Sequence, residues 1–374
     1  NLTAGTYVVS ATDVNGCSAS ETVTMSEPDS LFSSYTQSDY NGFGVSCNGD
    51  NNGSIDYNAI GGVHYPGQPH TYLWSNGSTS QDLSSLAAGT YSVVATDNNG
   101  CTTTETIIIT EPVTLTSSYT QSDYNGFGVS CNGGNNGEIL LAVLGGVTGQ
   151  SYSYEINGVS NSTNIFSNLT AGTYVVSATD VNGCSTSETV IITEADPINS
   201  LFFTTDWNNF EIQCNGGNNG EIILNVLGGV TGQSYSYEID GVSNSTNIFS
   251  NLTLGTYVVS ATDVNGCITS ETVTMTEPAT AITSSYTQSD YSGFGVSCNG
   301  DTDGSIDLTV NGGVAVVHTY AWSNGSTSED LALLTAGTYS VVASDDNGCT
   351  TTETIIITEP VTLTSSYTQS AYNG

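Results

Sequence analysis

The chain contains no lysine and no arginine among its 374 residues, and its 36 aspartates and glutamates give it a formal charge of −36. Without cations it has no arginine fork for phosphate or carboxylate, no P-loop or Schiff-base lysine and no basic patch. A polyanion is repelled by nucleic acid and by acidic membrane surfaces. We therefore expect no nucleic-acid partner, and we expect folding to rest on apolar burial, hydrogen bonds and cross-links.

The sequence also lacks long apolar runs and is poor in helix formers. No run of 18 apolar residues and no signal peptide is present, so we expect no direct membrane insertion. Thr, Ser, Val, Ile and Tyr dominate, which is a β composition. Because the chain opens and closes in the middle of a pattern, we expect it to be a segment of a longer protein.

Nine cysteines recur at a fixed period. Cys47, Cys131, Cys214 and Cys298 precede Asn-Gly, whereas Cys17, Cys101, Cys184, Cys267 and Cys349 follow Asn-Gly, and both series repeat every 82 to 84 residues. Such a period predicts a tandem array in which each unit contacts only its neighbours, and regular cysteines predict an oxidising, extracellular setting. The expected boundaries are 1–28 for the C-terminal part of a preceding repeat, 29–112, 113–196, 197–278 and 279–360 for repeats 1 to 4, and 361–374 for the start of another repeat.

Within one unit, short strands alternate with turn signals. In repeat 3, G-E-I-I-L-N-V-L-G-G (220–229) is bounded by glycines, and S-Y-S-Y-E-I-D-G (234–241) ends in a type I′ hairpin signal. The L-x-x-G-x-Y spacing, as in Leu169, Gly172 and Tyr174, is typical of a tyrosine corner, where the chain crosses between two sheets. We therefore predict an all-β fold: a rod-like array of small antiparallel, Ig-like or fibronectin-like β-sandwich repeats of about 83 residues.

The motif G-T-Y-x-V-x-A-x-D-x-N-G-C occurs five times and predicts a strand followed by a turn that a disulfide pins. Between the two cysteines of a unit we count four strands, and an even number of passes returns the chain to the pole where it began. This count predicts bridges within each repeat, and if the return strand N-I-F-S-N-L is really two strands, the bridges instead join adjacent repeats, for example Cys47 to Cys184. The pairs predicted by the first count are Cys47–Cys101, Cys131–Cys184, Cys214–Cys267 and Cys298–Cys349, with Cys17 unpaired.

The order C-N-G-x-x-x-G-x-I, G-G, Y-x-W-S-N-G, L-x-A-G-T-Y, D-x-N-G-C and T-E-P resembles the SprB repeat family, and the resemblance recurs in every unit. It implies a very large surface adhesin of gliding bacteria, exported by type IX secretion to the outer surface. Two units carry Y-E-I-[ND]-G in place of W-S-N-G, and the third begins with T-T-D-W-N-N-F.

Two acidic loops are candidate calcium sites. Asp301, Asp303 and Asp307 alternate around a glycine turn, which is a spacing used in Ca²⁺ loops, and Asp50, Asn52 and Asp56 keep part of it. The alternative is an Asx-rich hairpin loop without metal. His70 and His318 fall one to a unit and cannot form a zinc triad. We expect no required cofactor, and calcium is the one candidate.

Catalysis finds no support, since no G-x-S-x-G elbow exists and acidic pairs mean little among so many carboxylates. We predict a non-enzymatic, adhesive stalk of a cell-surface filament, whose partners are the neighbouring repeats of the same chain and an extracellular surface or polysaccharide. The alternative is a carbohydrate-binding repeat array, which requires exposed aromatics at equivalent places in each unit. Trp74 and Trp322 are expected in the sandwich core, where they would not serve as such platforms.

Overall fold

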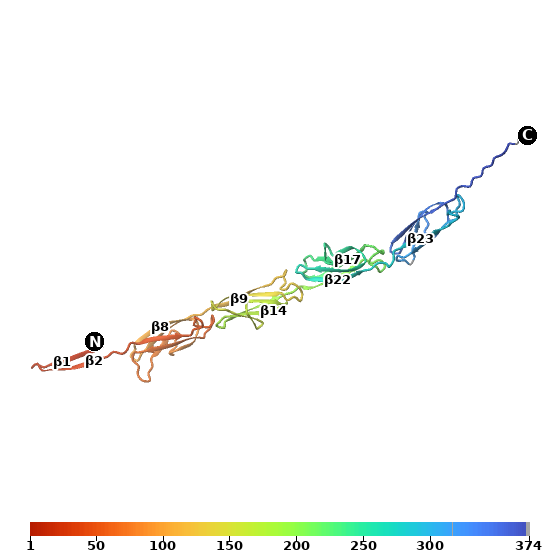
Figure 1. Ribbon diagram of the computed structural model, residues 1–374. Coiled ribbons are helices and arrows are strands. Elements are labelled where there is room, and N and C mark those ends of the chain that lie inside the picture. Colours follow the sequence, from red (N-terminus) through yellow and green to blue (C-terminus); the bar gives the residue numbers. More distant parts are fainter. Residues whose placement is uncertain (316, 372–374) are drawn as a thin grey trace. The chain divides into compact units, whose positions relative to one another are not determined.

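The computed structural model describes residues 1–315 and 317–371, and every regular element in them is a β-strand, with no helix. The chain divides into two compact units, one formed by Asn1–Val129 with Gly133–Thr193 and the other by Ser130–Asn132 with Glu194–Gly374. Figure 1 shows that each unit contains layered pairs of small sheets. The predicted fold class, a tandem series of antiparallel β-sandwich repeats, is confirmed.

Repeat 1 consists of two three-stranded antiparallel sheets. One has the order β3-β4-β6 and the other the order β5-β7-β8. Alternate residues of β4 are buried, among them Ile55 and Tyr57, as expected for a strand that packs one face against a core. The strand bounds are β3 (Phe32–Gln37), β4 (Gly53–Ile60), β5 (Thr71–Trp74), β6 (Leu83–Leu86), β7 (Gly89–Thr96) and β8 (Thr102–Ile109).

The other repeats follow the same plan. Repeat 4 has the sheets β23-β24-β26 and β25-β27-β28. Repeats 2 and 3 add one short strand to the second sheet. Repeat 2 therefore has the sheets β13-β10-β9 and β12-β11-β14-β15, and repeat 3 has β16-β17-β20 and β19-β18-β21-β22. A lone hairpin of β1 (Gly5–Thr12) and β2 (Ser18–Met25) precedes them.

The strand bounds in repeat 2 are β9 (Val113–Gln121), β10 (Gly137–Gly146), β11 (Ser153–Ile156), β12 (Val159–Asn161), β13 (Ile165–Leu169), β14 (Gly172–Thr179) and β15 (Ser185–Ile192). Those in repeat 3 are β16 (Asp196–Thr204), β17 (Gly220–Gly229), β18 (Ser236–Ile239), β19 (Val242–Asn244), β20 (Ile248–Leu252), β21 (Gly255–Thr262) and β22 (Ile268–Met275). Those in repeat 4 are β23 (Thr283–Gln288), β24 (Gly304–Asn311), β25 (Thr319–Trp322), β26 (Leu331–Leu334), β27 (Gly337–Ser344) and β28 (Thr350–Ile357).

The crossing between the two sheets is held by the predicted tyrosine corner. The Tyr174 hydroxyl donates to the backbone carbonyl of Thr170 at 3.0 Å, just before β14. The same bond, from Tyr to the carbonyl four residues earlier, occurs at Tyr91, Tyr257 and Tyr339. It satisfies the hydroxyl next to the core and fixes where the chain changes sheets.

The return segment that follows the hairpin makes two passes. In repeat 2, β12 runs back beside β11 in one sheet, and the chain then crosses to the other sheet, where β13 pairs with β10. The Asn161 side chain holds this bend by donating to the carbonyls of Thr163 and Ile165, at 2.7 and 2.8 Å. Five strands (β10 to β14), and not the four counted from the sequence, therefore separate Cys131 from Cys184, whereas in repeat 1 four strands (β4 to β7) lie between Cys47 and Cys101.

Each repeat has its own apolar core, and the four cores use two interchangeable packings. Trp74 in β5 and Leu83 in β6 are buried in repeat 1, and Trp322 with Leu331 repeats this pair in repeat 4. At the same register positions repeat 2 has Ile156 and the buried Phe166. The large ring has thus moved from one sheet to the other, which conserves core volume. The expected burial of Trp74 and Trp322 is confirmed, at 2% and 5% exposure.

This exchange predicts coupled substitutions in repeat 2. Ile156→Trp alone places a second large ring beside Phe166 and should cost roughly 1–3 kcal/mol through overpacking. Adding Phe166→Leu recreates the packing of repeat 4, where Leu308 stands in place of Leu141, and should recover most of that loss. Amide hydrogen exchange at Val176 reports the local free energy of opening. If the double variant exchanges as fast as the single variant, the two packings are not interchangeable.

Candidate functional site

The D-x-N-G-C turn is closed by a buried carboxylate. In repeat 2, one oxygen of Asp180 accepts the backbone N–H groups of Asn182 and Cys184, both at 3.0 Å, and the other accepts the N–H of Val147 at 3.0 Å. Asp97, Asp263 and Asp345 make the same three bonds. The carboxylate therefore shapes the turn and, in repeat 2, joins it to the loop that follows β10.

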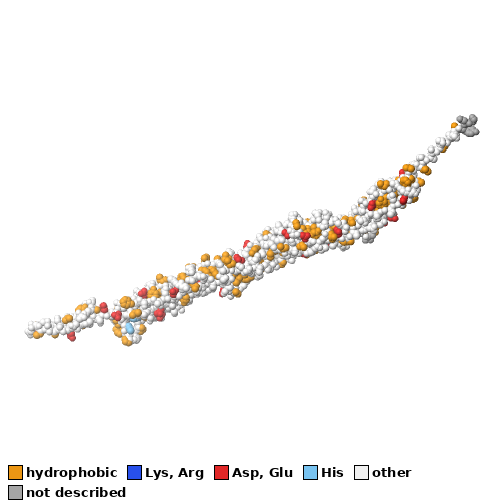
Figure 2. All heavy atoms as spheres, in the orientation of Figure 1, with side chains coloured by type: hydrophobic (Ala, Val, Ile, Leu, Met, Phe, Trp, Pro, Cys, Tyr) orange, Lys and Arg blue, Asp and Glu red, His pale blue; other side chains and the backbone are white. Residues whose placement is uncertain are grey.

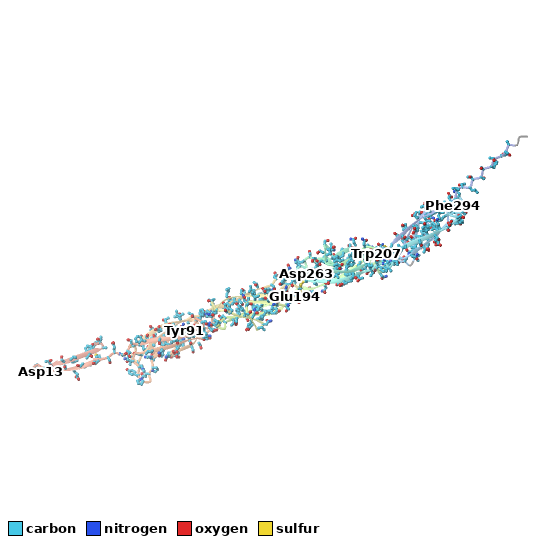
Figure 3. All side chains as sticks on the ribbon, viewed as in Figure 1. Asp13, Tyr91, Glu194, Trp207, Asp263 and Phe294 are labelled. Atoms are coloured by element: carbon cyan, nitrogen blue, oxygen red, sulfur yellow. A yellow bond between two sulfur atoms is a disulfide. The ribbon has the colours of Figure 1, made fainter. Side chains whose placement is uncertain are left out.

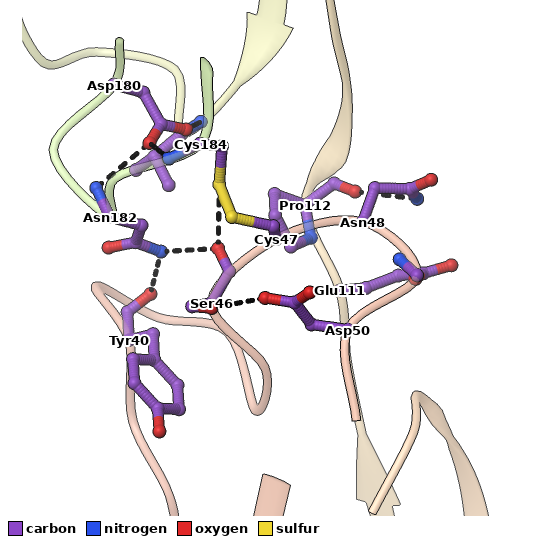
Figure 4. Close-up of a disulfide and its surroundings, with 12 residues drawn as sticks. Tyr40, Ser46, Cys47, Asn48, Asp50, Glu111, Pro112, Asp180, Asn182 and Cys184 are labelled. Carbon is purple, nitrogen blue, oxygen red and sulfur yellow. Dashed lines mark hydrogen bonds between the residues drawn. A yellow bond between two sulfur atoms is a disulfide. The ribbon is translucent and has the colours of Figure 1, made fainter. Parts of the chain in front are cut away.

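The asparagine of this turn recognises another repeat. Its amide nitrogen donates at 3.0 Å to the backbone carbonyls of Tyr40 and Ser46 in repeat 1 (Figure 4), and its oxygen accepts from Asn41 at 2.6 Å. The positive φ of the turn lies at Gly183 (88°), not at Asn182. The Asn182 side chain joins two successive repeats.

A disulfide completes the contact, and it corrects the predicted pairing. Cys184 is bonded to Cys47, with 5.6 Å between their Cα atoms, and its sulfur lies 3.3 Å from the Ser46 carbonyl (Figure 4). The predicted bridge Cys47–Cys101 is wrong because Gly44 and Val45 bond to Thr110, at one end of the β7–β8 hairpin, whereas Cys101 lies in the turn at the other end. In repeat 2, Gly128 and Val129 bond to Thr193 in the same way, and Cys184 lies in the turn at the other end of the β14–β15 hairpin.

The same junction occurs twice more. Cys131 is bonded to Cys267 and Cys214 to Cys349, so the predicted bridges Cys131–Cys184, Cys214–Cys267 and Cys298–Cys349 are also wrong. At the last of these junctions the Asn347 amide donates to the carbonyls of Gln213 and Trp207, at 3.0 and 3.3 Å. Each bridge joins the first cysteine of one repeat to the second cysteine of the next, while Cys17, Cys101 and Cys298 are free and exposed.

The C-N-G loop also holds the segment that leaves its own repeat. The Asn48 amide donates to the Pro112 carbonyl at 3.0 Å, and the Gly49 N–H donates to the Glu111 carboxylate at 2.8 Å. Asn215 with Gly216 and Asn299 with Gly300 bind the other two T-E-P segments in the same way. One loop thus binds both the exit from its repeat and the turn of the following repeat.

The candidate calcium ligands lie in hydrogen-bonded loops. The Ser46 hydroxyl donates to Asp50 at 2.6 Å and its N–H to Asn52 at 3.1 Å, while Asp56 lies on the exposed side of β4. In repeat 4, Asp301 and Asp303 accept from Ser297 in the same manner, and Asp307 is exposed on β24. Among the described residues no group of three or more His, Cys, Asp or Glu side chains could hold a metal ion. Calcium binding stays a prediction, and an unchanged thermal unfolding curve between chelator and millimolar Ca²⁺ would remove it.

The two equivalent histidines lie against backbone carbonyls. His70 and His318 each place a ring nitrogen 3.1 Å from a backbone carbonyl, of Gly61 and Gly312 respectively. Acidic side chains are dispersed over the face seen in Figure 2. Trp207 and Phe294, labelled in Figure 3, belong to equivalent small bridges of repeats 3 and 4, and the Trp207 carbonyl accepts from Asn347. Within the described residues no helix is long and apolar enough to cross a membrane.

Comparison with known proteins identifies the repeats. The family model described as the SprB repeat matches residues 45–79, 129–161, 211–244 and 296–327, once in each repeat. No curated protein matches the chain.

Similar solved structures resemble the chain only weakly. They include a Ca²⁺-stabilized adhesin with which an Antarctic bacterium binds ice (18% identity, 83% of this chain and 94% of that one, TM-score 0.35) and the insect immune protein hemolin (12%, 84% and 96%, 0.22). A third is a four-domain fragment of protocadherin gamma B2 (11%, 84% and 96%, 0.24).

The closed turn predicts an acidic titration for Asp97. The N–H of Val63 is the main cause that holds the pKa of this carboxyl below its usual value; burial opposes it, and the N–H groups of Cys101, Asn99 and Gly100 reinforce it. Because the folded pKa lies below the unfolded value of about 3.9, the carboxylate contributes stability that is present above roughly pH 4 and is lost as the pH falls through the folded pKa. Carbon NMR of the carboxyl group should give a midpoint below about 3.9, with Asp97→Asn as the assignment control. A midpoint at or above that value would contradict the role of the N–H groups.

Proposed function

We propose that this chain, in which the SprB repeat model matches each of the four repeats, is a stalk segment of a large adhesin at a bacterial cell surface. The family match indicates an adhesin-type repeat region, and the structure has disulfides between its repeats. The stalk itself, export by type IX secretion and a role in gliding motility are part of the proposal, as are the repeat boundaries 29–112, 113–196, 197–278 and 279–360 and a rod-like arrangement.

The observation that carries this proposal is the staggered disulfide pattern. Cys47 and Cys349 are 302 residues apart in the sequence. Through the bridges Cys47–Cys184 and Cys214–Cys349, however, the only backbone between them is the segment from 184 to 214, a separation of 30. Fully extended, the longer path spans on the order of 1,000 Å and the shorter about 100 Å. Tension along the chain is therefore borne by the short path.

Most strands of each sandwich lie outside this path. The segment 184–214 contains β15, the junction and β16, whereas the strands between the two cysteines of each repeat sit in closed covalent loops. The bridge Cys131–Cys267 shortens the covalent path from Cys131 to Cys298 in the same way, because only the segment from 267 to 298 then separates them. Between Cys47 and Cys349, pulling on the ends therefore loads β15 and β16 but not the strands that the covalent loops enclose. This property suits a stalk at a moving or attached cell surface.

The charge supports an exposed, extended role. A formal charge of −36 makes neighbouring stalks repel and discourages pairing between exposed strand edges. The absence of Lys and Arg also denies trypsin-like proteases a cleavage site. Among the described residues we find no arrangement of side chains that suggests catalysis, and we propose a non-enzymatic role.

The alternative, a carbohydrate-binding array, has one observation in its favour. An aromatic ring that is 41–43% exposed occupies the same place in every repeat, at Tyr35, Tyr119, Phe202 and Tyr286. These residues pair in register with buried core residues, for example Tyr119 with Leu141, so they lie on the core-facing side of an edge strand. Covering the core accounts for them. Binding of a polysaccharide that Tyr119→Ala abolishes would favour the alternative.

The stalk proposal predicts a limited extension under force. The whole chain, with Cys17, Cys101 and Cys298 changed to Ser, is stretched from its ends with and without a reductant. Reduction should lengthen the available path by about 270 residues, on the order of 900 Å. Removing the first bridge with Cys47→Ser and Cys184→Ser should release on the order of 350 Å. The matched control, Cys131→Ser with Cys267→Ser, should release nothing, because the short path does not use that bridge.

An oxidised chain that extends as far as the reduced chain would show that tension does not follow the bridges. The stalk would then lose its main support.

A further inference from the structure

One loop distinguishes repeat 1 from the other repeats. The connection between the Gly-Gly pair and the strand that follows it spans eight residues in repeat 1 (63–70), six in repeats 2 and 3 (147–152 and 230–235) and five in repeat 4 (314–318). In tandem arrays, an insertion in one repeat forms a loop on one face, which is often the binding face. The inserted loop, residues 63–70, therefore gives repeat 1 a surface that the other repeats lack.

The inserted loop is held in a fixed shape. At its tip, the Gln68 N–H donates to the Tyr65 carbonyl at 2.9 Å, and Gly67 between them has the left-handed φ of 81° that this turn requires. At its base, the Val63 carbonyl accepts the N–H of Asn98 at 3.0 Å. A loop that is ordered before binding loses little conformational entropy when a ligand arrives.

A cleft of about 570 Å³ lies between the inserted loop and the strands β4 and β5. His64 and His70 of the loop line it, together with Ala59 of β4, Tyr72 of β5 and Gln81. Figure 2 shows histidine at the surface of this repeat, bordered by hydrophobic side chains. The volume falls within the range of small-molecule sites, which is roughly 300 to 1,000 Å³.

Two side chains of the cleft are each positioned by one hydrogen bond and keep a second polar atom. The Nε2 atom of His70 lies 3.1 Å from the Gly61 carbonyl, so this nitrogen carries the proton and Nδ1 is able to accept. The Gln81 amide nitrogen donates to the Tyr57 carbonyl at 2.8 Å, which leaves the amide oxygen as an acceptor. The cleft therefore presents acceptors on side chains that are already held in place.

Tyr72 supplies an aromatic ring to the cleft. This half-buried ring meets the buried ring of Tyr57 at an angle of 88°, with 5.9 Å between the centroids. In repeat 2 a second tyrosine, Tyr152, takes the place of His70, and its ring lies 6.5 Å from that of Tyr154, the equivalent of Tyr72. Repeat 3 has the same pair of tyrosines. Repeat 1 has the smaller imidazole at this place.

Two further differences enlarge the cleft and remove a carboxylate from it. Valine stands at the place of Ala59 in the other three repeats, for example Val310, so repeat 1 has the smallest side chain there. In repeat 4, burial and the adjacent carboxylate of Glu329 raise the pKa of Tyr320 to about 12. Repeat 1 has the neutral Gln81 where repeat 4 has Glu329. A longer loop, a smaller side chain and a lost charge thus coincide at one cleft.

We propose that this cleft in repeat 1 binds one neutral sugar ring of a glycan. A pyranose has an apolar face of C–H groups, which packs against the Tyr72 ring. Its hydroxyl groups donate to the Gln81 oxygen and to Nδ1 of His70. The proposal does not depend on the stalk function, and it concerns a single site in one repeat and not an array.

The charge of the chain selects a neutral sugar. With a formal charge of −36 and no Lys or Arg, the protein repels an anionic sugar and has no cationic side chain to pair with it. The residues that line the cleft, all in the described part of the chain, include no Asp or Glu to hold a cationic ligand. Hydrogen bonds and apolar contact are the interactions that the lining side chains offer.

The test applies the whole chain, with its disulfides intact, to an array of neutral, sulfated and sialylated glycans. We expect binding to at least one neutral glycan and none to the anionic ones. Calorimetric titration of the whole chain with the neutral glycan that binds should then give one site per chain. A site in every repeat would contradict the proposal, because only repeat 1 has the inserted loop.

Two variants close the cleft without disturbing the fold. Ala59→Val introduces the side chain that the other repeats carry at this place, and it should weaken binding about tenfold or more. Replacing residues 63–70 by residues 314–318 should abolish binding. The melting temperature of both variants should stay within a few degrees of that of the unaltered chain, since repeat 4 folds with the same valine and the same short loop.

Two matched controls locate the site. Val310→Ala makes the reverse change in repeat 4 and should leave the affinity unchanged. Tyr119→Ala removes an exposed ring from an edge strand of repeat 2 and should also leave it unchanged. If no neutral glycan binds, if anionic glycans bind equally well, or if Ala59→Val keeps the original affinity, the cleft is not a sugar site and the proposal is overturned.

Discussion

The carboxylate that closes each D-x-N-G-C turn is the interaction on which the other contacts depend. By accepting the N–H groups of the turn and one N–H of a loop from the other sheet, Asp180 fixes the turn on the sandwich. The turn then presents Asn182 and Cys184 in the one arrangement that fits the neighbouring loop. A carboxylate can do this without a cation because several backbone N–H groups together stabilise its charge. In a chain with no Lys or Arg, backbone N–H groups take the place that ion pairs occupy elsewhere.

Cores and junctions vary independently in this array. The large core ring sits in β5 of repeat 1, at Trp74, and in β13 of repeat 2, at Phe166. The junctions keep the same Asp, Asn, Gly and Cys throughout. A core needs only a filled volume, which several combinations of side chains supply. A junction needs an amide that reaches two carbonyls and a thiol that reaches another thiol, which few substitutions allow. Apolar packing therefore stabilises each repeat, and polar geometry decides how repeats are joined.

The bridges between repeats also determine which bonds resist extension of the chain. A disulfide inside one repeat would restrain that repeat alone. A disulfide between repeats closes loops of 135 to 137 residues that overlap from one repeat to the next. Since the loops overlap, opening one sandwich does not lengthen the covalent path between distant points. Resistance to extension then rests on S–S and backbone bonds, and the modest free energy of folding of each small sandwich matters less.

The sequence by itself determined the period, the all-β class, the tyrosine corner and the burial of Trp74, because each depends on local spacing, turn chemistry or the size of an apolar ring. It also placed the cysteine of the D-x-N-G-C motif at a turn. Only the tertiary structure decided which cysteines meet. The difference arose from a single bend at residues 161–165, where the Asn161 side chain turns an apparent return strand into two passes in two sheets. A strand too short to show alternation leaves no periodic signal, yet it reverses the pole at which Cys184 lies. The partners of Asn182 were hidden for a similar reason: they are backbone carbonyls some 140 residues away, and a carbonyl carries no mark in the sequence.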